Sequence, residues 1–273
     1  KEEIGTFSNT FIHDSLFNLR DKNGVKTTFN ALNQPIGTDE VYDPNGRLIT
    51  RGELSFKYDP FDRLIEVQSP DETFTYTYDP FNRRMSRNET RFFWDGQEEI
   101  GSFDQGIADL KIMAKGKIIA CEIGNIPYAI QSDFKNTPVL YIGADKQFVS
   151  GPFALQGKRK DAVTGFVYFG ARDYDPDQGR FISCDPKGYA DGFNLYHYAR
   201  NNPNRFNDYY GHTSISDIAK EPLSYGWHAL KTIYNHSTLS GIGSIVSADL
   251  EPHINTCRNR LKYCWEKDSS HLP

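Results

Sequence analysis

Short stretches in which apolar and polar residues alternate fill the first part of the chain. Leu54, Phe56 and Tyr58 alternate with polar residues, and the same pattern returns at residues 74–78. A period of two places every second side chain on the same face of a strand. Because turn-forming residues interrupt the alternation repeatedly, the pattern predicts successive antiparallel hairpins across residues 25–100.

A repeated turn motif separates these strands. The sequence Tyr-Asp-Pro begins at Tyr42, Tyr58 and Tyr78, and an Arg opens the strand that follows each motif. An Asp at the first turn position can accept hydrogen bonds from backbone N–H groups two or three residues later, and Pro presets φ for a type I turn. We therefore expect the Asp, Pro and Arg to be structural. The expected turns are residues 43–46, 59–62 and 79–82.

The pattern changes after the repeats. Residues 100–150 form a second predicted β stretch, in which residues 139–142 are expected to be a buried strand and Cys121 a small buried apolar residue. From residue 212 onward the spacing becomes helical. The apolar residues that share one helical face are Leu223, Trp227, Leu230 and Tyr234. The sequence therefore predicts a mainly β fold followed by a short α-helical C-terminal tail.

Composition narrows the classes of function. Aromatic residues make up 14% of the chain, with 22 Gly and 14 Pro, which favours a turn-rich β protein and argues against extensive disorder. The formal net charge is −5, whereas general nucleic-acid binders are usually basic. No apolar run approaches the length of a membrane helix, and the 4 Cys are too sparse for a disulfide scaffold. A start at Lys1 without a signal peptide suggests the C-terminal part of a longer protein.

Several short motifs follow one another in the second half of the chain. They are Gly-Ala-Arg-Asp-Tyr-Asp-Pro at 170–176, Gly-Arg-Phe at 179–181, Asp-Pro-Lys-Gly at 185–188, Asn-Leu-Tyr-His-Tyr at 194–198 and Asn-Asn-Pro at 201–203. In this order they resemble the RHS-repeat-associated core of the Rhs/YD-repeat family, and the Tyr-Asp turns upstream resemble its YD repeats. The resemblance covers residues 29–211.

The resemblance implies three parts. Residues 1–151 would be a fragment of a YD-repeat β-hairpin shell, residues 152–211 the core that plugs it, and residues 212–273 a variable helical tail. The implied function is that of the C-terminal part of a bacterial polymorphic toxin, secreted or held at the cell surface, whose shell encloses and delivers the tail. The implied partners are the upstream shell of the same chain, secretion machinery and an immunity protein. No cofactor or metal is implied.

In this family the core also cuts the chain at its boundary with paired aspartates. Such chemistry needs two carboxyl groups close enough that one stays protonated while the other activates water, and a neighbouring Arg can hold one of them ionised. The expected site residues are Asp173, Asp185, Asp208 and Arg172, with the cut between Gly211 and His212. Residues 208–212 read Asp-Tyr-Tyr-Gly-His, where the family commonly has Asp-Pro-x-Gly-Leu. The alternative is that these aspartates only cap turns.

Two further questions stay open in the sequence. The Tyr-rich hairpins would also suit a cell-surface adhesion or carbohydrate-binding protein without toxin activity. The tail would suit a small effector, a toxin remnant or a docking segment, and His228 or His236 would suit acid–base chemistry there. His253 and Cys257 share a helical face with Cys264, but no fourth ligand is evident, so no metal site is predicted.

Overall fold

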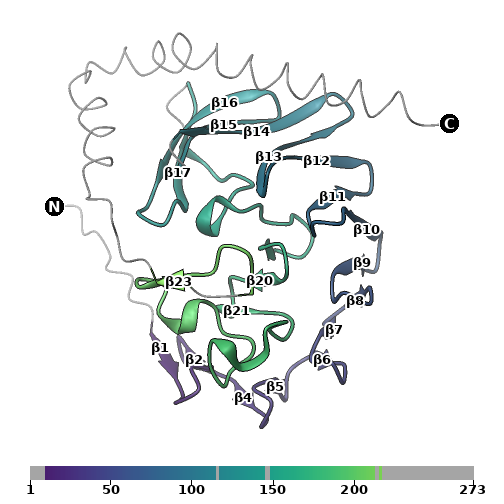
Figure 1. Cartoon of the computed structure of the whole chain (residues 1–273), viewed down its shortest axis with the longest axis vertical. Coiled ribbons are helices and arrows are strands. Elements are labelled where there is room, and N and C mark those ends of the chain that lie inside the picture. The colour runs from purple at the N-terminus through teal and green to yellow at the C-terminus, as the bar shows by residue number, and fades with distance from the viewer. Residues whose placement is uncertain (1–9, 115–116, 145–147, 213–214, 217–273) are drawn as a thin grey trace. The chain divides into compact units, whose positions relative to one another are not determined.

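The computed structural model describes residues 10–114, 117–144, 148–212 and 215–216. These residues pack as two units (Figure 1). The first unit combines the described residues up to Thr75 with those from Thr164 onward, and the second contains the described residues from Tyr76 to Val163. The first unit is therefore built from two separate pieces of the chain.

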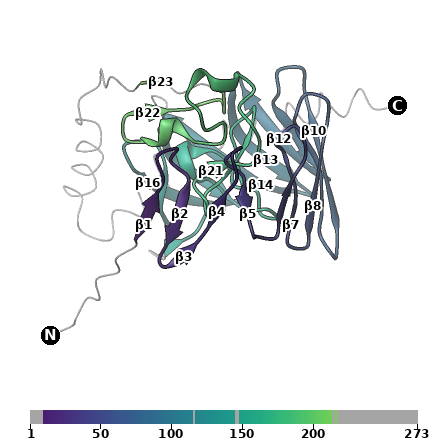
Figure 2. The ribbon, with the colours of Figure 1, turned by 90° about the horizontal axis from the view of Figure 1, so that it is seen from below.

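Short antiparallel strands make up the N-terminal piece of the first unit. Strands β1 to β3 pair in sequence order, as Figure 2 shows, β4 pairs with β5, and β6 to β10 again pair in order. The strands are β1 (Phe11–His13), β2 (Leu19–Lys22), β3 (Val25–Lys26), β4 (Thr28–Phe29), β5 (Pro35–Ile36), β6 (Glu40–Tyr42), β7 (Leu48–Arg51), β8 (Leu54–Tyr58), β9 (Leu64–Gln68) and β10 (Thr73–Tyr78). The predicted hairpins are therefore confirmed.

The second piece of the first unit contains residues 164–211 of the predicted core, whereas residues 152–163 belong to the second unit. Its elements are β19 (Val167–Tyr168), β20 (Asp173–Asp175), β21 (Arg180–Phe181), the 3-10 helices η2 (Gly188–Ala190) and η3 (Ala199–Asn201), β22 (Phe206–Asn207) and β23 (Ile215–Ser216). Four aromatic rings pack edge to face or tilted, with centroids 5.2 to 6.0 Å apart. They are Phe169, Tyr174, Phe181 and Tyr198. These rings give the core an apolar centre despite its few strand residues.

The core is bound to the tips of the hairpins in the same unit. The Asn194 side chain donates to the backbone oxygen of Leu16, Arg180 donates to the backbone oxygen of Asn33, and the Tyr196 hydroxyl donates to that of Gly46. Each acceptor lies in a different hairpin turn, at 14–18, 30–34 and 43–47. The core therefore contacts successive turns of the repeat through buried polar groups. As expected from the sequence, Asn194, Tyr196 and Tyr198 are all buried.

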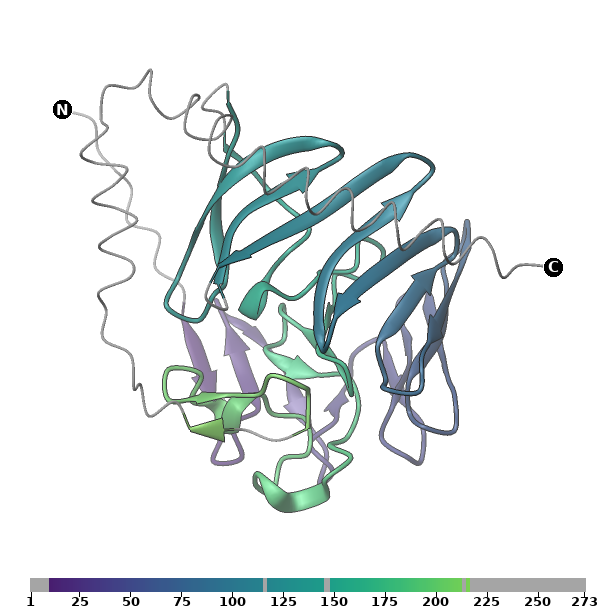
Figure 3. The ribbon, with the colours of Figure 1, turned by 45° about the horizontal axis from the view of Figure 1, so that its top comes forward.

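The second unit is a meander of longer strands, seen in Figure 3. Strand β10 pairs with β11, and the strands then pair in sequence order to β18. They are β11 (Arg84–Arg87), β12 (Thr90–Asp95), β13 (Glu98–Asp104), β14 (Ile107–Ala114), β15 (Lys117–Ile123), β16 (Ile126–Ser132), β17 (Pro138–Ile142) and β18 (Phe148–Val149), followed by the 3-10 helix η1 (Leu155–Gly157). Cys121 is fully buried, as predicted. The predicted buried strand is only partly so: in β17 Tyr141 is buried and Val139 is exposed, while Leu140 and Ile142 are half-buried.

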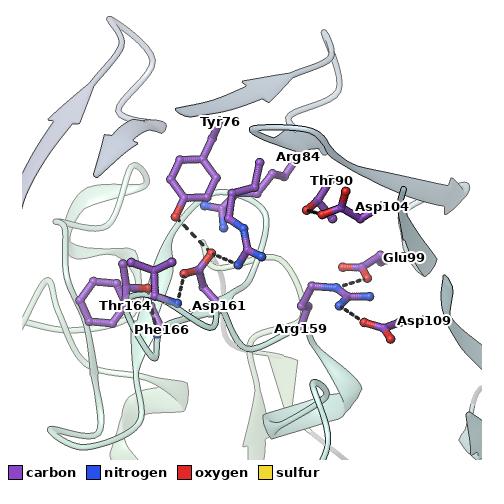
Figure 4. A network of polar contacts seen from close by, with 12 residues as sticks. Tyr76, Arg84, Thr90, Glu99, Asp104, Asp109, Arg159, Asp161, Thr164 and Phe166 are labelled. Atoms are coloured by element: carbon purple, nitrogen blue, oxygen red, sulfur yellow. Dashed lines mark hydrogen bonds and ion pairs between the residues drawn. The ribbon is translucent and has the colours of Figure 1, made fainter. Parts of the chain in front are cut away.

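Buried ion pairs tie the last segment of this unit to its strands (Figure 4). Arg159 contacts Glu99 at 2.6 Å and Asp109 at 3.3 Å, and the hydroxyl of Tyr76 donates to Asp161 at 3.1 Å. Side chains that are charged and enclosed need such partners, because an unpaired buried charge is costly. These contacts hold the segment that leads from η1 back into the first unit.

The predicted fold class is confirmed for the described part of the chain, which is mainly β. The predicted helical tail, with its histidines and cysteines, lies outside the described residues. No helix among the described residues is long and apolar enough to span a membrane.

Candidate functional site

The repeat turns define a local geometry that also bears on the candidate site. In the turn that begins at Asp43, the Oδ1 atom accepts the N–H groups of Asn45 and Arg47, both at 2.9 Å. The intervening Gly46 N–H donates to the backbone oxygen of Asp43, and Gly46 has φ of +77°. The prediction that the Asp carboxylate accepts the N–H groups two or three residues later was thus half right. The N–H groups that it accepts are two and four residues away, because the N–H three residues away donates to the backbone carbonyl of the Asp instead.

The turns that begin at Asp59 and Asp79 repeat this geometry. In both, Oδ1 accepts the N–H groups two and four residues later at 2.9 to 3.0 Å, and the residue three positions later has φ of +62°. Burial works against the charged form of both carboxyls, but the backbone donors and the Arg of the turn outweigh it and lower the pKa of each. The structural role predicted for these residues is confirmed.

The predicted cleavage boundary shares two features with these turns. The N–H of His212 donates to Oδ1 of Asp208 at 3.0 Å, which is the same four-residue spacing. Gly211, three residues after Asp208, has φ of +73°. A Cβ atom at Gly211 would lie 3.1 Å from the backbone nitrogen of Arg172, so both the conformation and the close approach favour glycine.

Arg172 joins the other parts of the site. Its Nη2 atom contacts Oδ2 of Asp185 at 2.9 Å and Oδ2 of Asp208 at 3.2 Å, and its Nε donates to the backbone oxygen of Gly211. Its Nη1 donates to the backbone oxygen of Leu195 at 3.0 Å, and the guanidinium lies 3.7 Å from the ring centroid of Phe181. The guanidinium is buried and held on several sides, so its direction toward Gly211 is fixed.

One peptide bond is therefore held at both ends. The carbonyl oxygen of Gly211 accepts from Arg172, while the nitrogen of His212 donates to Asp208. The preceding carbonyl, that of Tyr210, accepts from the N–H of Ala171 at 3.0 Å. Residues 208–212 form a turn at the predicted boundary, here called the boundary turn. Two consecutive carbonyls of this turn accept hydrogen bonds from two consecutive residues that precede β20, Ala171 and Arg172.

Asp185 differs from the turn aspartates in the direction of its pKa shift. Burial raises the pKa of Asp185. Arg172 and the Lys187 N–H act in the opposite direction, whereas the charges of Asp208 and Asp191 add to the increase. Burial also lowers the pKa of Arg172 against the pull of both carboxylates, but a guanidinium stays charged at neutral pH. The site therefore combines a fixed cation with a carboxyl group whose pKa is raised.

The structure brings together three of the four predicted site residues, Arg172, Asp185 and Asp208. Asp173 lies in β20 close to Tyr58, where burial raises the pKa of the tyrosine and the charge of Asp173 adds to that increase. Sequence reasoning missed the contact between Arg172 and the carbonyl of Gly211. It also missed that residues 208–212 resemble the repeat turns. The signal was present in the sequence, since Gly211 follows Asp208 by three residues, as Gly46 follows Asp43.

The hydroxyl groups of the repeat tyrosines donate hydrogen bonds to other residues of the same chain. The Tyr42 hydroxyl donates to Glu40, that of Tyr58 donates to the backbone oxygen of Leu48, and that of Tyr76 donates to Asp161. A carbohydrate-binding role for these faces stays a prediction.

No family model matches the chain. It is 39% identical over 85 residues to toxin subunit YenC2 of Yersinia entomophaga, covering 31% of this chain and 9% of that protein. It is 27% identical over 221 residues to the tRNA3(Ser)-specific nuclease WapA of Bacillus spizizenii, covering 66% and 9%. Against the probable deoxyribonuclease RhsB of Dickeya dadantii it is 25% identical over 286 residues, covering 85% and 20%. The relatives of this chain are Rhs/YD-repeat-type toxins. The resemblance drawn from the motifs is therefore confirmed.

Solved Tc toxin structures share the fold. The chain matches one in a Photorhabdus luminescens Tc holotoxin pore that carries a TccC3 mutation, with a TM-score of 0.57 and 18% identity over 78% of this chain and 13% of that one. It also matches a TcdB2–TccC3 structure without the hypervariable C-terminal region, with a TM-score of 0.55 over 74% of this chain. At this identity the likeness concerns the fold alone. The chain spans 9 to 20% of the length of its curated Rhs-type relatives.

Proposed function

We propose that this chain is part of an Rhs/YD-repeat polymorphic toxin, and that its core cuts the bond between Gly211 and His212 once. The observation that supports the cleavage is that both ends of this bond are hydrogen-bonded. The carbonyl oxygen of Gly211 accepts from Arg172, and the nitrogen of His212 donates to Asp208. Pairing of a guanidinium with a carbonyl oxygen favours attack at the carbonyl carbon, because the oxygen gains negative charge in the transition state.

The reaction is a hydrolysis in which one proton moves twice. Water attacks the carbonyl carbon of Gly211, and the Asp208 carboxylate takes a proton from that water. The resulting oxyanion is stabilised by Arg172. Asp208 then returns the proton to the nitrogen of His212, the carbon–nitrogen bond breaks, and the products are a carboxylic acid at Gly211 and an amine at His212.

Asp185 supplies the second carboxyl group of the pair. Its raised pKa extends the protonated form to higher pH, and with Asp185 protonated, Asp208 can be ionised without a second negative charge beside it. Because both Oδ2 atoms contact the same Nη2 of Arg172, a change in the protonation of one carboxyl group is felt by the other. Asp173, which lies toward Tyr58, takes no part in this mechanism.

The wider role rests on the relatives. The hairpins and the core would form part of a shell that encloses and delivers the residues after the cut, as a toxin delivered to a competing or host cell. The partners we propose are the upstream shell of the same chain, secretion machinery and an immunity protein, and the location is secreted or at the bacterial cell surface.

Incubation of the purified chain tests the cleavage directly. We expect a fragment that begins at His212 on a denaturing gel, identified by mass spectrometry. Asp208→Asn should keep the chain whole, because an amide fills the same space but cannot take a proton from water. Asp79→Asn is the matched control, since Asp79 caps a turn of the same kind outside the site, and it should cut at the wild-type rate. A single intact wild-type band after long incubation would mean that the aspartates of the site only cap turns.

A further inference from the structure

In three repeat turns, the Asp side chain forms an ion pair with an arginine of the same turn. Arg47, Arg63 and Arg83 each lie four residues after the turn Asp, and each places Nε and Nη2 at 2.6 to 2.7 Å from its Oδ2 atom. The Oδ1 atom is meanwhile held by two backbone N–H groups of the turn. Both oxygens of these carboxylates are therefore used within the turn.

The boundary turn has histidine at the equivalent place. His212 lies four residues after Asp208, and its ring stacks on that of Tyr210 with centroids 6.1 Å apart. An imidazole has no parallel pair of N–H donors with which to bind one carboxylate oxygen as a guanidinium does. At Asp208 the guanidinium on Oδ2 comes instead from Arg172, which also contacts Asp185 and the carbonyl of Gly211.

We propose that the residue at position 212 decides whether the boundary turn can be cleaved or is a structural turn, in which both oxygens of the Asp carboxylate are bound by the turn itself. His212 leaves Oδ2 of Asp208 to Arg172, whereas an arginine at this position would take Oδ2 with two bonds, as in the repeat turns. This inference rests on the proposed cleavage, and it makes His212 a positioning residue for Asp208.

Competition between the two arginines gives the physical reason. An arginine at position 212 belongs to the same turn as Asp208, so little conformational freedom is lost when it binds, and its two parallel bonds exceed the single contact of Arg172 at 3.2 Å. With Asp208 bound in this way, its carboxylate would be a weaker base toward water.

For cleavage, the absence of an arginine four residues after the turn Asp is necessary but not sufficient. The turns at Asp14 and Asp133 have Asn18 and Thr137 at the fourth position and the same pair of Oδ1 contacts. In the Asp14 turn, the Asn18 side chain donates to Oδ2 at 3.1 Å. What distinguishes the boundary turn is Arg172, which reaches both Asp208 and the carbonyl of the bond to be cut.

The first test compares two substitutions of similar reach in the full chain. His212→Arg can make the paired contact, and His212→Met cannot. We expect the fragment that begins at residue 212 to form at least about tenfold more slowly in H212R than in H212M, in the range of a charge-assisted pair. Equal rates in the two variants would overturn the proposal, whereas an uncut wild-type chain would contradict only the proposed cleavage.

The second test does not depend on cleavage. A crystal structure of the full chain carrying H212R should show Nε and Nη2 of the new arginine on Oδ2 of Asp208, in the geometry of the repeat turns, with Arg172 withdrawn from that oxygen. The matching H212M structure should keep Arg172 on Asp208. An arginine at position 212 directed into solvent, with Arg172 still on Asp208, would overturn the proposal even for a chain that never cuts.

Discussion

The pKa of an aspartate is shifted in opposite directions at different places in this chain. For Asp59 and Asp79, turn N–H groups and a turn arginine outweigh burial and lower the pKa. Burial prevails at Asp185, and its pKa is raised although Arg172 lies 2.9 Å away. The difference follows from the deeper burial of Asp185 and from the charges of Asp208 and Asp191 beside it, whereas Asp59 and Asp79 each accept two backbone N–H groups as well as their turn arginine.

A pH dependence of the cleavage follows from this shift. The proposed mechanism uses protonated Asp185, and a raised pKa extends that form to higher pH. The cleavage rate should therefore fall as pH rises through the pKa of Asp185 in the folded protein. Asp191→Asn removes a neighbouring charge that contributes to the increase, so the decline in rate should move to lower pH. Rate profiles of both proteins, measured by gel densitometry, check this. Identical profiles would contradict the role given to Asp185.

Residues in the site were predictable to different degrees. The motifs indicated Arg172, Asp185 and Asp208, since each lies in a short segment that resembles the Rhs core. The effect of Asp173 on the pKa of Tyr58 was not predictable, because Tyr58 lies far away in the chain. Contacts of this kind arise from tertiary structure, and no local spacing encodes them.

At the scale of elements, the turns carry most of the information in the sequence. An Asp with an arginine four residues later fixes the hairpins at Asp43, Asp59 and Asp79, because the bonds from the Asp carboxylate stay within the turn. The core is harder to predict because β19 to β22 contain only two or three residues each, too few for a periodic pattern. Its order comes from aromatic packing and from bonds to the hairpin turns.

The contact between core and turns can be tested at Gly46. A Cβ atom there would lie 2.4 Å from Sγ of Cys184 and 2.7 Å from the Tyr196 hydroxyl. Gly46→Ala should lower the free energy of unfolding by about 2 to 3 kcal/mol, through overpacking and the positive φ. Gly24→Ala is the control, since Gly24 has φ of +87° and nothing within 4 Å, and it should cost about 1 kcal/mol. Urea unfolding of the two variants measures the difference, and equal losses would show that the core does not press on this turn.

At the scale of the whole molecule, the cut need not release the C-terminal fragment. Strand β23 pairs with β22, so that Phe206 lies opposite Ser216 and Asn207 opposite Ile215. The backbone on the two sides of the boundary is thus hydrogen-bonded across it. These bonds do not involve the bond between Gly211 and His212, and they persist when it is broken.

We therefore expect the products to stay together under native conditions. The wild-type sample should elute from a size-exclusion column as one peak, while a denaturing gel of that peak shows two bands. Pro substitution of Asn207 removes a backbone donor from β22 and should weaken the retention of the fragment. Two native peaks for the wild-type protein would show that the pairing of β22 with β23 does not hold it.

The first unit is assembled from two pieces of chain with the whole of Tyr76–Val163 between them. The backbone N–H of Leu48 donates to the oxygen of Ile182, and Phe56 packs against Phe166 with ring centroids 5.8 Å apart. During synthesis the early hairpins leave the ribosome with the apolar side of these strands uncovered. At a translation rate of about 5 to 20 residues per second, that surface waits roughly 5 to 20 seconds for its partner. A nascent chain of this design therefore has a defined interval in which a chaperone can bind it, and in which crowding of neighbouring ribosomes would favour aggregation.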